Sequence, residues 1–492
     1  MIRTILHSDM NSCYASIEAK LNPKLKNKAM AVAGDPKNRH GIILAKSQEA
    51  KILGVKTGEA IWQAKIKCPN LILVPPHYEK YLEFSRKARK IYYSYTNRVE
   101  PFGLDECWLD VSESLKLFGN GEEIAGQIRE RMKKELGITV SVGVSFNKIF
   151  AKLGSDLKKP DATTVIKKEN FKEIVWPLDI SSIIGIGKAT KRKLNGIGIY
   201  TLGDLAKTDS DAIRGILGIN GLYLWQYANG LDDRPVKDYS YKEIIKTIGN
   251  SSTLVEDLYT NEEVYNIFQI LALNVSKRLR EAKLSSMGVK IFIRDNNLFS
   301  FEFQMPINNP TQSSIILSEK AIELFKKKYK WNFPIRALGI RAINLVDEKI
   351  PAQTDIFSDY KKIVKKEKID KVIYDIRKKY DKNVLTFASL KNNKKFPKDK
   401  TEIVTLPNGR IRWIGFISYF FIYKLKKIYI DEKKFLLSFY LIRNFFQKKF
   451  YSLSTVAIIC QKTMYLSIKV VNNNLLILWG CIKTLDSCFN FE

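Results

Sequence analysis

Three carboxylates stand close together in FGLDECWLDV, residues 102–111, where Asp105 and Glu106 are adjacent and Asp110 follows four residues later. The segment predicts a strand, because apolar side chains fill the remaining positions and a Pro-Phe-Gly turn precedes it. Carboxylates in an apolar strand are costly to bury unless positive charge meets them. A divalent cation such as Mg²⁺ takes oxygen ligands of this kind. An edge strand with solvated acids is the alternative.

A further carboxylate, Asp9, ends the mostly apolar run RTILHSD at residues 3–9. The next segment, CYASIEAKL (13–21), has helical spacing, so Asp9 lies at a strand-to-helix junction, where backbone N–H groups can receive phosphate. One acid at the end of a strand and two on another strand form the layout of a two-metal site for phosphoryl transfer. Such ions assist the attacking oxygen and neutralise charge on the phosphorus.

Three segments together resemble one protein family: HSDMNSCYASIE (7–18), GLDECWLD (103–110) and SVGVSFNKIFAKLGSDLKKP (141–160). In order and spacing they are similar to the Y-family of translesion DNA polymerases, and most similar to its DinB, or DNA polymerase IV-like, group. The resemblance covers residues 2–347, and a weaker similarity continues to about residue 390.

The resemblance implies an α+β and α/β multidomain fold, a right-hand polymerase with a ferredoxin-like palm, fingers, a helical thumb and an α/β little finger. Strand–helix–strand arms around the acids agree with a split βαβ palm. The expected boundaries are 1–12 and 79–167 for the palm, 13–78 for the fingers, 168–235 for the helix-hairpin-helix thumb, 236–244 for a linker, 245–347 for the little finger, 348–400 for a clamp-binding and basic helical extension, and 401–492 for an atypical tail of unknown structure.

The resemblance also implies a mechanism. Asp9, Asp105 and Glu106, with the backbone carbonyl of Met10, would hold two Mg²⁺ ions while the primer 3′-OH attacks the α-phosphorus of a dNTP and pyrophosphate leaves. Positioning and charge neutralisation would supply most of the catalysis. Error-prone synthesis across damaged templates follows from the resemblance. We expect no proofreading, because the sequence has no further acid cluster of exonuclease character.

Four residues are expected to contact the incoming nucleotide. Tyr14 matches the aromatic steric gate that excludes a ribose 2′-OH, although a core aromatic at a helix start is the alternative. Lys159, before Pro160, matches a lysine on the triphosphate. Gln48 and Lys51 stand where many members carry a Tyr and an Arg, so the planar two-pronged grip of arginine is lost while Lys51 keeps the charge. Exposed helix positions are the alternative for both.

Two regions predict contacts with the DNA backbone. IIGIGKATKRKLNGIGIYTLGDLA (183–206) has the pattern of a helix-hairpin-helix, in which glycine lets backbone N–H groups approach a phosphate. ILGINGLYLWQY (216–227) has the pattern of a weaker second copy. The alternating strands of the little finger place basic residues on candidate phosphate-facing edges. The expected contacts are Gly185, Gly187, Lys188 and Lys191 in the thumb, and Lys290, Arg294, Arg336 and Arg341 in the little finger.

The segment Gln353-Thr-Asp-Ile356-Phe357 is similar to the peptide with which bacterial polymerases bind the sliding clamp, a Gln followed by an aliphatic–aromatic pair. A five-residue match of this kind is weakly specific. The polar segment 359–380 is predicted to be helical. Residues 401–492 fit no expected domain, and the longest uncharged apolar run there, 413–423, is too short to span a bilayer. A segment lying on a membrane surface is the alternative.

Composition supports a polyanion as partner. The 492 residues contain 82 Lys and Arg against 51 Asp and Glu, a formal net charge of +31, which favours salt-dependent attachment to nucleic acid. The six cysteines form no CxxC pattern, so neither zinc nor a disulfide framework is expected. We expect a cytoplasmic monomer without a signal peptide or membrane partner, acting on primer-template DNA and dNTPs.

Two other functions share parts of this pattern. A non-catalytic DNA-binding repair protein would keep the thumb and little finger, but it would not need all three acids. A two-metal nuclease would need the acids, but it would not need Tyr14, Lys51 and Lys159 around a nucleotide. DNA affinity that ignores Mg²⁺ and triphosphates would indicate the first, and release of nucleotides from a labelled strand would indicate the second.

Overall fold

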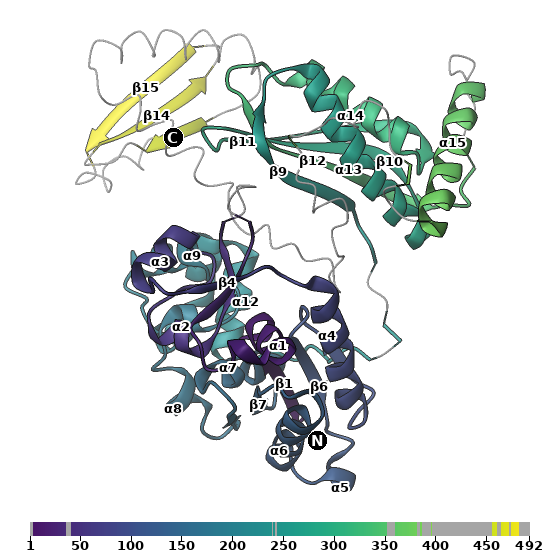
Figure 1. The fold of residues 1–492 in the computed structure, drawn as a ribbon. Coiled ribbons are helices and arrows are strands. Elements are labelled where there is room, and N and C mark those ends of the chain that lie inside the picture. Colours follow the sequence, from purple (N-terminus) through teal and green to yellow (C-terminus); the bar gives the residue numbers. More distant parts are fainter. Residues whose placement is uncertain are drawn as a thin grey trace. The chain divides into compact units, whose positions relative to one another are not determined.

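The computed structural model shows a chain of two units, Met1–Ile411 and Arg412–Glu492. The first unit contains the palm, fingers, thumb and little finger, whose elements are labelled in Figure 1. The residues described are 3–35, 41–238, 240–241, 244–351, 360–380, 384–385, 395, 455–459, 464–471 and 474–481.

A five-stranded sheet forms the palm, with the strand order β5-β6-β1-β7-β8. Strand β1 lies between β6 and β7 and is antiparallel to both. Side chains alternate between the two faces of a strand, so Leu6 and Met10 lie on one face while His7 and Asp9 lie on the other. The strands are β1 (Ile5–Met10), β5 (Val99–Pro101), β6 (Glu106–Asp110), β7 (Val140–Ser145) and β8 (Thr163–Ile166).

Helices cover both faces of this sheet (Figure 1). Helices α4 (Tyr78–Tyr93) and α6 (Gly121–Arg131) bury the face of Leu6 and Met10. Helix α7 (Lys148–Leu157) packs against β1 and β7 on the face of Asp9. Apolar residues along α4 and just after it belong to the core: Tyr81, Phe84, Ala88, Ile91 and Tyr95 are all buried.

Gly143 on β7 sets how closely α7 approaches the sheet. A Cβ atom built at this position would lie 1.9 Å from the carbonyl oxygen of Ala151 and 2.5 Å from the backbone nitrogen of Ser155. Both atoms belong to the backbone of α7, so no side-chain rotation can make room. The glycine therefore brings the α7 side chains down onto the strand that carries Asp9.

We expect Gly143→Ala to destabilise the palm by about 1–3 kcal/mol or more, because a methyl group there forces α7 away from the sheet. Gly126→Ala on α6 is the matched control, since a Cβ there meets nothing within 4 Å, and alanine raises helix stability by roughly 1 kcal/mol over glycine. Chemical unfolding of both variants checks the prediction. Equal stability of Gly143→Ala and the native chain would contradict it.

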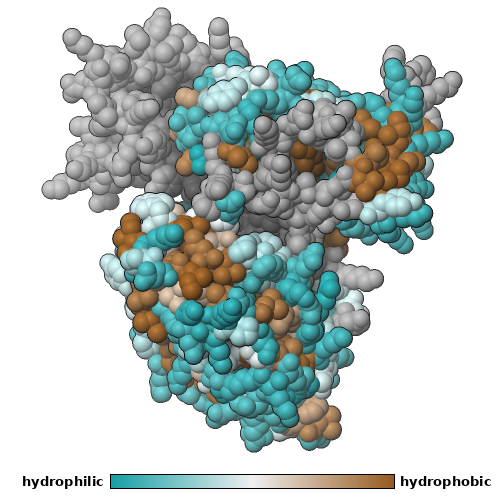
Figure 2. All heavy atoms as spheres, viewed as in Figure 1, coloured by the Kyte–Doolittle hydropathy of each residue, from teal (hydrophilic) through white to brown (hydrophobic). Residues whose placement is uncertain are grey.

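The fingers contain a small three-stranded sheet, ordered β3-β2-β4, with helices on both faces. Helices α2 and α3 bury one face through residues such as Ala50 and Ala64, and Ala15 of α1 packs on the other. Exposed apolar side chains gather on α2 and α3, where Figure 2 shows a brown patch: Ile52, Leu53, Trp62 and Ile66. The elements are α1 (Cys13–Leu21), η1 (Pro23–Leu25), β2 (Met30–Ala33), β3 (Ile43–Lys46), α2 (Gln48–Ile52), α3 (Ile61–Lys67) and β4 (Ile72–Val74).

The thumb is helical, as predicted, but the helix expected before the Gly-Ile-Gly turn is only a short 3₁₀ turn, η4. The Asp179 carboxylate accepts a hydrogen bond from the Ser181 N–H, which favours a tight turn over a longer helix. The weaker second hairpin is present as α11 packed on α12. The elements are α8 (Phe171–Val175), η4 (Ile180–Ser182), α9 (Lys188–Asn195), α10 (Leu202–Lys207), α11 (Ser210–Leu217) and α12 (Ile219–Ala228).

The little finger is a four-stranded antiparallel sheet, ordered β11-β10-β12-β9, whose apolar face is covered by two helices. Strand β9 was not predicted, because its buried positions include the polar residues Asn250 and Ser252 beside apolar ones. Backbone pairing with β12 keeps this segment in the sheet. The elements are β9 (Ile248–Leu258), α13 (Asn261–Ala282), β10 (Leu284–Asp295), β11 (Ser300–Thr311), α14 (Ser314–Lys328) and β12 (Ile335–Asp347).

A further helix, α15 (Tyr360–Lys379), confirms the helix predicted in that segment and packs against α14. In the second unit the described residues form an antiparallel sheet of β13 (Thr455–Ile459), β14 (Met464–Val471) and β15 (Asn474–Cys481). Within the described ranges, no helix has both the length and the apolar character needed to cross a membrane.

Candidate active site

The two acidic segments meet at the centre of the palm sheet. Asp9 and Glu106 are direct partners in the antiparallel pairing of β1 with β6, a relation that brings Cβ atoms within about 5.5 Å. The Met10 backbone N–H donates a hydrogen bond of 3.0 Å to the Asp105 carbonyl, which fixes the turn before β6 beside the end of β1. The three acids predicted to act together are therefore adjacent.

Two lysines hold these carboxylates. Lys159 Nζ lies 2.7 Å from Asp9 Oδ2 and 2.9 Å from Asp156 Oδ1. Lys152 Nζ, on α7, lies 2.9 Å from Glu106 Oε2 and 3.6 Å from Asp9 Oδ2. The side chain predicted to bind triphosphate, Lys159, thus lies at the acids, together with a second ammonium group.

The pKa values of the three acids are shifted in different directions. Burial and repulsion between the carboxylates raise two of them, and contacts with positive or hydrogen-bonding groups lower the third. Burial, reinforced by the charges of Glu106 and Asp9, raises the pKa of Asp105 to about 7. Burial and the charge of Glu106 raise the pKa of Asp9, although Lys159 and Lys152 oppose this. Burial alone would raise the pKa of Glu106, but the contacts with His7 and Lys152 hold it at about 2. The carboxylates of this centre therefore carry more negative charge than Lys152 and Lys159 neutralise.

His7 stands behind Glu106 in a fully buried position. Ser155 Oγ lies 2.8 Å from His7 Nδ1 and 2.8 Å from the Lys152 carbonyl oxygen. The ring packs edge-on against Trp108 at 5.1 Å, and its Nε2 faces Glu106 Oε2 at 3.4 Å. Burial lowers the pKa of His7, whereas the contact with Glu106 opposes this lowering.

The acids are of the chemical type that binds a divalent cation, but the structure does not hold them in a preformed metal-binding arrangement. Across the part of the chain that the structure describes, no three His, Cys, Asp or Glu side chains converge in a metal-binding arrangement; Lys152 and Lys159 hold the carboxylates instead. However, Glu106 Oε2 is buried without a hydrogen-bond partner among the described residues, because Lys152 approaches it outside hydrogen-bonding geometry. A buried carboxylate oxygen that lacks a hydrogen bond, beside two acids of raised pKa, is a position that a cation would stabilise.

Binding of Mg²⁺ should therefore depend on pH through Asp105. Without metal, its folded pKa of about 7 lies above the unfolded value of about 3.9. The contribution of Asp105 to the free energy of unfolding is therefore on the order of 4 kcal/mol. It is fully present below about pH 3.9 and is lost as the pH rises to about 7. Mg²⁺ binds the ionised carboxylate, so we expect the thermal stabilisation by Mg²⁺ to increase from pH 5 to pH 8.

The Asp105→Asn variant provides the control for this expectation, because it cannot ionise at that position. Its Mg²⁺ stabilisation should be small and nearly independent of pH over the same range. Thermal unfolding midpoints with and without Mg²⁺ are the measurement. An equal Mg²⁺ effect at pH 5 and pH 8 in the native chain would contradict the assignment.

Tyr14 lies beside the acids at the start of α1. Its ring stacks on Tyr81 with centroids 4.2 Å apart and planes 9° apart, and Tyr78 meets it edge-on at 6.2 Å. Burial and the nearby charge of Asp105 raise its pKa. The ring is half-buried, so it is rigidly held while one part remains accessible next to Asp105.

The other predicted nucleotide contacts lie on the fingers. Gln48 begins α2, and Lys51 follows one turn later as an exposed side chain. Lys46, at the end of β3, lies close enough to Lys51 that burial and this second charge lower its pKa. The structure therefore keeps Gln48 and Lys51 together on one helix, with Lys46 near Lys51.

The predicted DNA contacts are distributed over two regions. In the thumb, Gly185 has a positive φ of 102°, and a Cβ atom at Gly187 would meet nothing within 4 Å. Lys191 Nζ lies 2.6 Å from Asp179 Oδ2, so its charge is less available to a DNA phosphate. Lys188 is exposed.

In the little finger, Lys290 and Arg341 are cross-strand partners. They lie on the face of the sheet opposite the helix-covered residues Val289 and Ile291. Arg294 shares that face, and the charge of Arg336 contributes to lowering its pKa, after burial. The predicted clamp peptide, Gln353, Ile356 and Phe357, lies outside the described residues.

One residue of the centre was not predicted. Lys148 and Lys152, four residues apart, were expected to share a helix face next to the site, but Lys148 is buried against Glu100 at 2.5 Å while Lys152 reaches the acids. His7 was not singled out, although it stands two residues before Asp9 and so shares its face of β1. The period-two spacing was the available signal.

Comparison with known proteins agrees with this geometry. The family models described as "impB/mucB/samB family", "IMS family HHH motif" and "impB/mucB/samB family C-terminal domain" match residues 8–156, 168–199 and 245–356. DNA polymerase IV of Acetivibrio thermocellus is 47% identical over 380 residues, covering 77% of this chain and 95% of that protein. DNA polymerase IV of Bacillus velezensis is 39% identical over 384 residues, covering 78% and 92%.

A solved structure shows the same architecture. The Y-family DNA polymerase chimera Dbh-Dpo4(243-245)-Dbh superposes with a TM-score of 0.63 and 25% sequence identity, covering 70% of this chain and 99% of that one. The fold predicted from sequence, a multidomain polymerase hand with a helix-hairpin-helix thumb and a little finger, is thereby confirmed. The chain belongs to the impB/mucB/samB family, as a DinB-like member of the Y-family DNA polymerases.

Proposed function

We propose that this protein is a DNA-directed DNA polymerase that copies damaged templates by nucleotidyl transfer from a dNTP to a primer 3′-OH. The observation that carries the proposal is the convergence of Asp9 and Glu106 in register on adjacent strands, with Lys159 Nζ 2.7 Å from Asp9. A non-catalytic DNA-binding protein has no need for Asp9 and Asp105, acids whose pKa values are raised by burial and by neighbouring carboxylates. The relatives named DNA polymerase IV support the same activity.

Asp9, Asp105 and Glu106, with the Met10 carbonyl, would hold two Mg²⁺ ions, which when bound neutralise charge on the reacting phosphate. Lys159 would release Asp9 and bind the triphosphate, because a phosphate carries more charge than one carboxylate. Lys152 would stay between Glu106 and Asp9 and limit their repulsion. Lys51 and Gln48 would contact the outer phosphates from the fingers.

Tyr14 would select the sugar. Its ring is fixed by stacking on Tyr81, so it cannot swing away from a ribose 2′-OH without losing that contact. The exposed thumb glycines and the basic face of the little-finger sheet would hold the primer-template backbone without reading its sequence. Error-prone synthesis without a proofreading step, and docking on a sliding clamp through Gln353, Ile356 and Phe357, complete the proposal.

Incorporation of single nucleotides on a labelled primer tests this function. With Mg²⁺, each of the four template bases should direct addition mainly of its complementary dNTP, and extension should continue past an abasic site. Shortening of the primer without dNTP would instead indicate a nuclease. Primer binding without extension under any divalent cation would reduce the protein to a DNA-binding module.

A further inference from the structure

Helix α15 is part of the little finger, although it lies beyond the residues 245–356 matched by the C-terminal family model. Two of its acids face inward. Asp370 is 3% exposed and accepts hydrogen bonds from the Ser314 hydroxyl at 2.5 Å and from the Ile315 N–H at 3.2 Å. It therefore caps the first turn of α14 from another helix.

Glu367, one turn earlier, binds the strand end that leads into α14. It accepts hydrogen bonds from the backbone N–H groups of Gln312 and Ser313, both at 3.2 Å, and from the Thr311 hydroxyl. Its second oxygen lies 3.5 Å from Arg280 of α13. Lys366 adds an ion pair of 2.5 Å with Glu319 on α14. These contacts fix which face of α15 is turned away from the domain.

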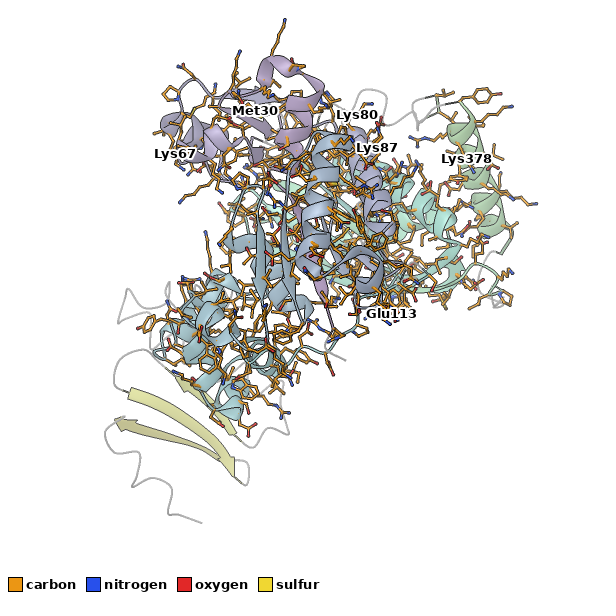
Figure 3. The ribbon with its side chains drawn as sticks, turned by 90° about the horizontal axis from the view of Figure 1, so that it is seen from below. Met30, Lys67, Lys80, Lys87, Glu113 and Lys378 are labelled. Atoms are coloured by element: carbon orange, nitrogen blue, oxygen red, sulfur yellow. The ribbon has the colours of Figure 1, made fainter. Side chains whose placement is uncertain are left out.

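The outward face is strongly basic because the docking contacts use two of the three acids of α15. Asp375 is the remaining acid and is exposed. Among the described residues, Lys365, Lys368 and Lys371 form no ion pair, and all three are exposed. The side chain of Lys378, labelled in Figure 3, continues the basic face toward the end of the helix. From Lys365 to Lys378 this face is about 20 Å long, at 1.5 Å per residue.

We propose that the outward face of α15, formed by Lys365, Lys368, Lys371 and Lys378, binds the phosphate backbone of duplex DNA. Lysines one helical turn apart lie about 5–6 Å from each other, a spacing suited to successive phosphates of one strand. Such contacts bind without sequence preference and release counterions. Ile369 and Val372 are also exposed beside these lysines, at 42% and 56%, so a protein partner is the competing occupant.

The test uses the full chain and a labelled primer-template, with binding measured by fluorescence anisotropy over a series of salt concentrations. The variant carries Lys365→Gln, Lys368→Gln, Lys371→Gln and Lys378→Gln. We expect the slope of log affinity against log salt to decrease by about 2–4, since each phosphate contact contributes about 0.9. Affinity at low salt should fall at least about tenfold, while the rate of single-nucleotide addition at saturating DNA stays unchanged.

The control removes the same charge from the palm through Lys80→Gln, Lys87→Gln, Lys90→Gln and Lys116→Gln, four exposed lysines of which Lys80 and Lys87 are labelled in Figure 3. The slope of log affinity against log salt should stay close to native in this variant. Asp370→Ala, which releases α15 from α14 without touching a lysine, should weaken DNA binding as well. A salt slope equal in native and α15 variants would overturn the proposal. Because the salt slope is a binding measurement, this result does not depend on polymerase activity.

Discussion

Replacing Glu106 by alanine is expected to reduce primer extension by at least about a thousandfold, since loss of several kcal/mol of charge stabilisation corresponds to that factor. Glu106 is the acid that stays ionised, with a pKa held at about 2, and it pairs in register with Asp9. Its loss would also leave Lys152 without its closest carboxylate. Rates of single-nucleotide addition under single-turnover conditions provide the measurement.

Glu113→Ala is the matched control for this variant, because Glu113, labelled in Figure 3, has a 76% exposed side chain that pairs with Arg98 at the surface. It should extend primers at the native rate. Both variants should bind primer-template DNA with native affinity, since neither residue lies in the thumb or little finger. Native-like extension by Glu106→Ala would show that another group serves the reaction.

Tyr14→Ala should admit ribonucleotides. The alanine removes the ring that stacks on Tyr81 and opens space beside Asp105 for a 2′-OH. We expect the ratio of ribonucleotide to deoxyribonucleotide incorporation, as kcat/KM, to rise by about a hundredfold, within the range that steric selection provides. Steady-state or pre-steady-state incorporation of rNTP and dNTP opposite the same template base measures it.

Two variants separate the steric effect from a loss of packing. Tyr14→Phe keeps the ring and its stacking, so sugar selection should stay close to native. Tyr78→Ala removes the edge-on neighbour of Tyr14 at 6.2 Å and should change selection far less than Tyr14→Ala. If ribonucleotide use rose equally in all three variants, the selection would not depend on the Tyr14 ring.

The sequence predicted the catalytic strands because apolar alternation and a turn define them locally. Asp9, Asp105 and Glu106 were predicted to converge, and the register of β1 with β6 brings them together. Strand β9 was not predicted, since the polar residues Asn250 and Ser252 occupy two of its five buried positions and its pairing with β12 is non-local. Lys148 and Lys152 were both expected next to the site, and the packing of α7 on Gly143 determines that Lys152 is the one that reaches the acids.

The docking of α15 could not be read from the sequence either. Its composition indicated a polar, solvated helix, and the role of Asp370 depends on the position of the α14 N-terminus, which is distant along the chain. The boundary placed at residue 347 therefore ends the little finger too early, since α15 is bonded to β11, α13 and α14. Local patterns predict elements, whereas the partners of buried acids depend on tertiary packing.

The most direct measurement of the central claim is the number of Mn²⁺ ions bound to the acids, counted by electron paramagnetic resonance. The sample would contain the full chain, a primer ending in a dideoxynucleotide and the complementary dNTP, so that no reaction occurs. We predict two bound Mn²⁺ per chain that require both DNA and dNTP, and fewer in Glu106→Ala. A count that does not change when dNTP is added, or when Glu106 is replaced, would contradict a two-metal polymerase site at Asp9, Asp105 and Glu106.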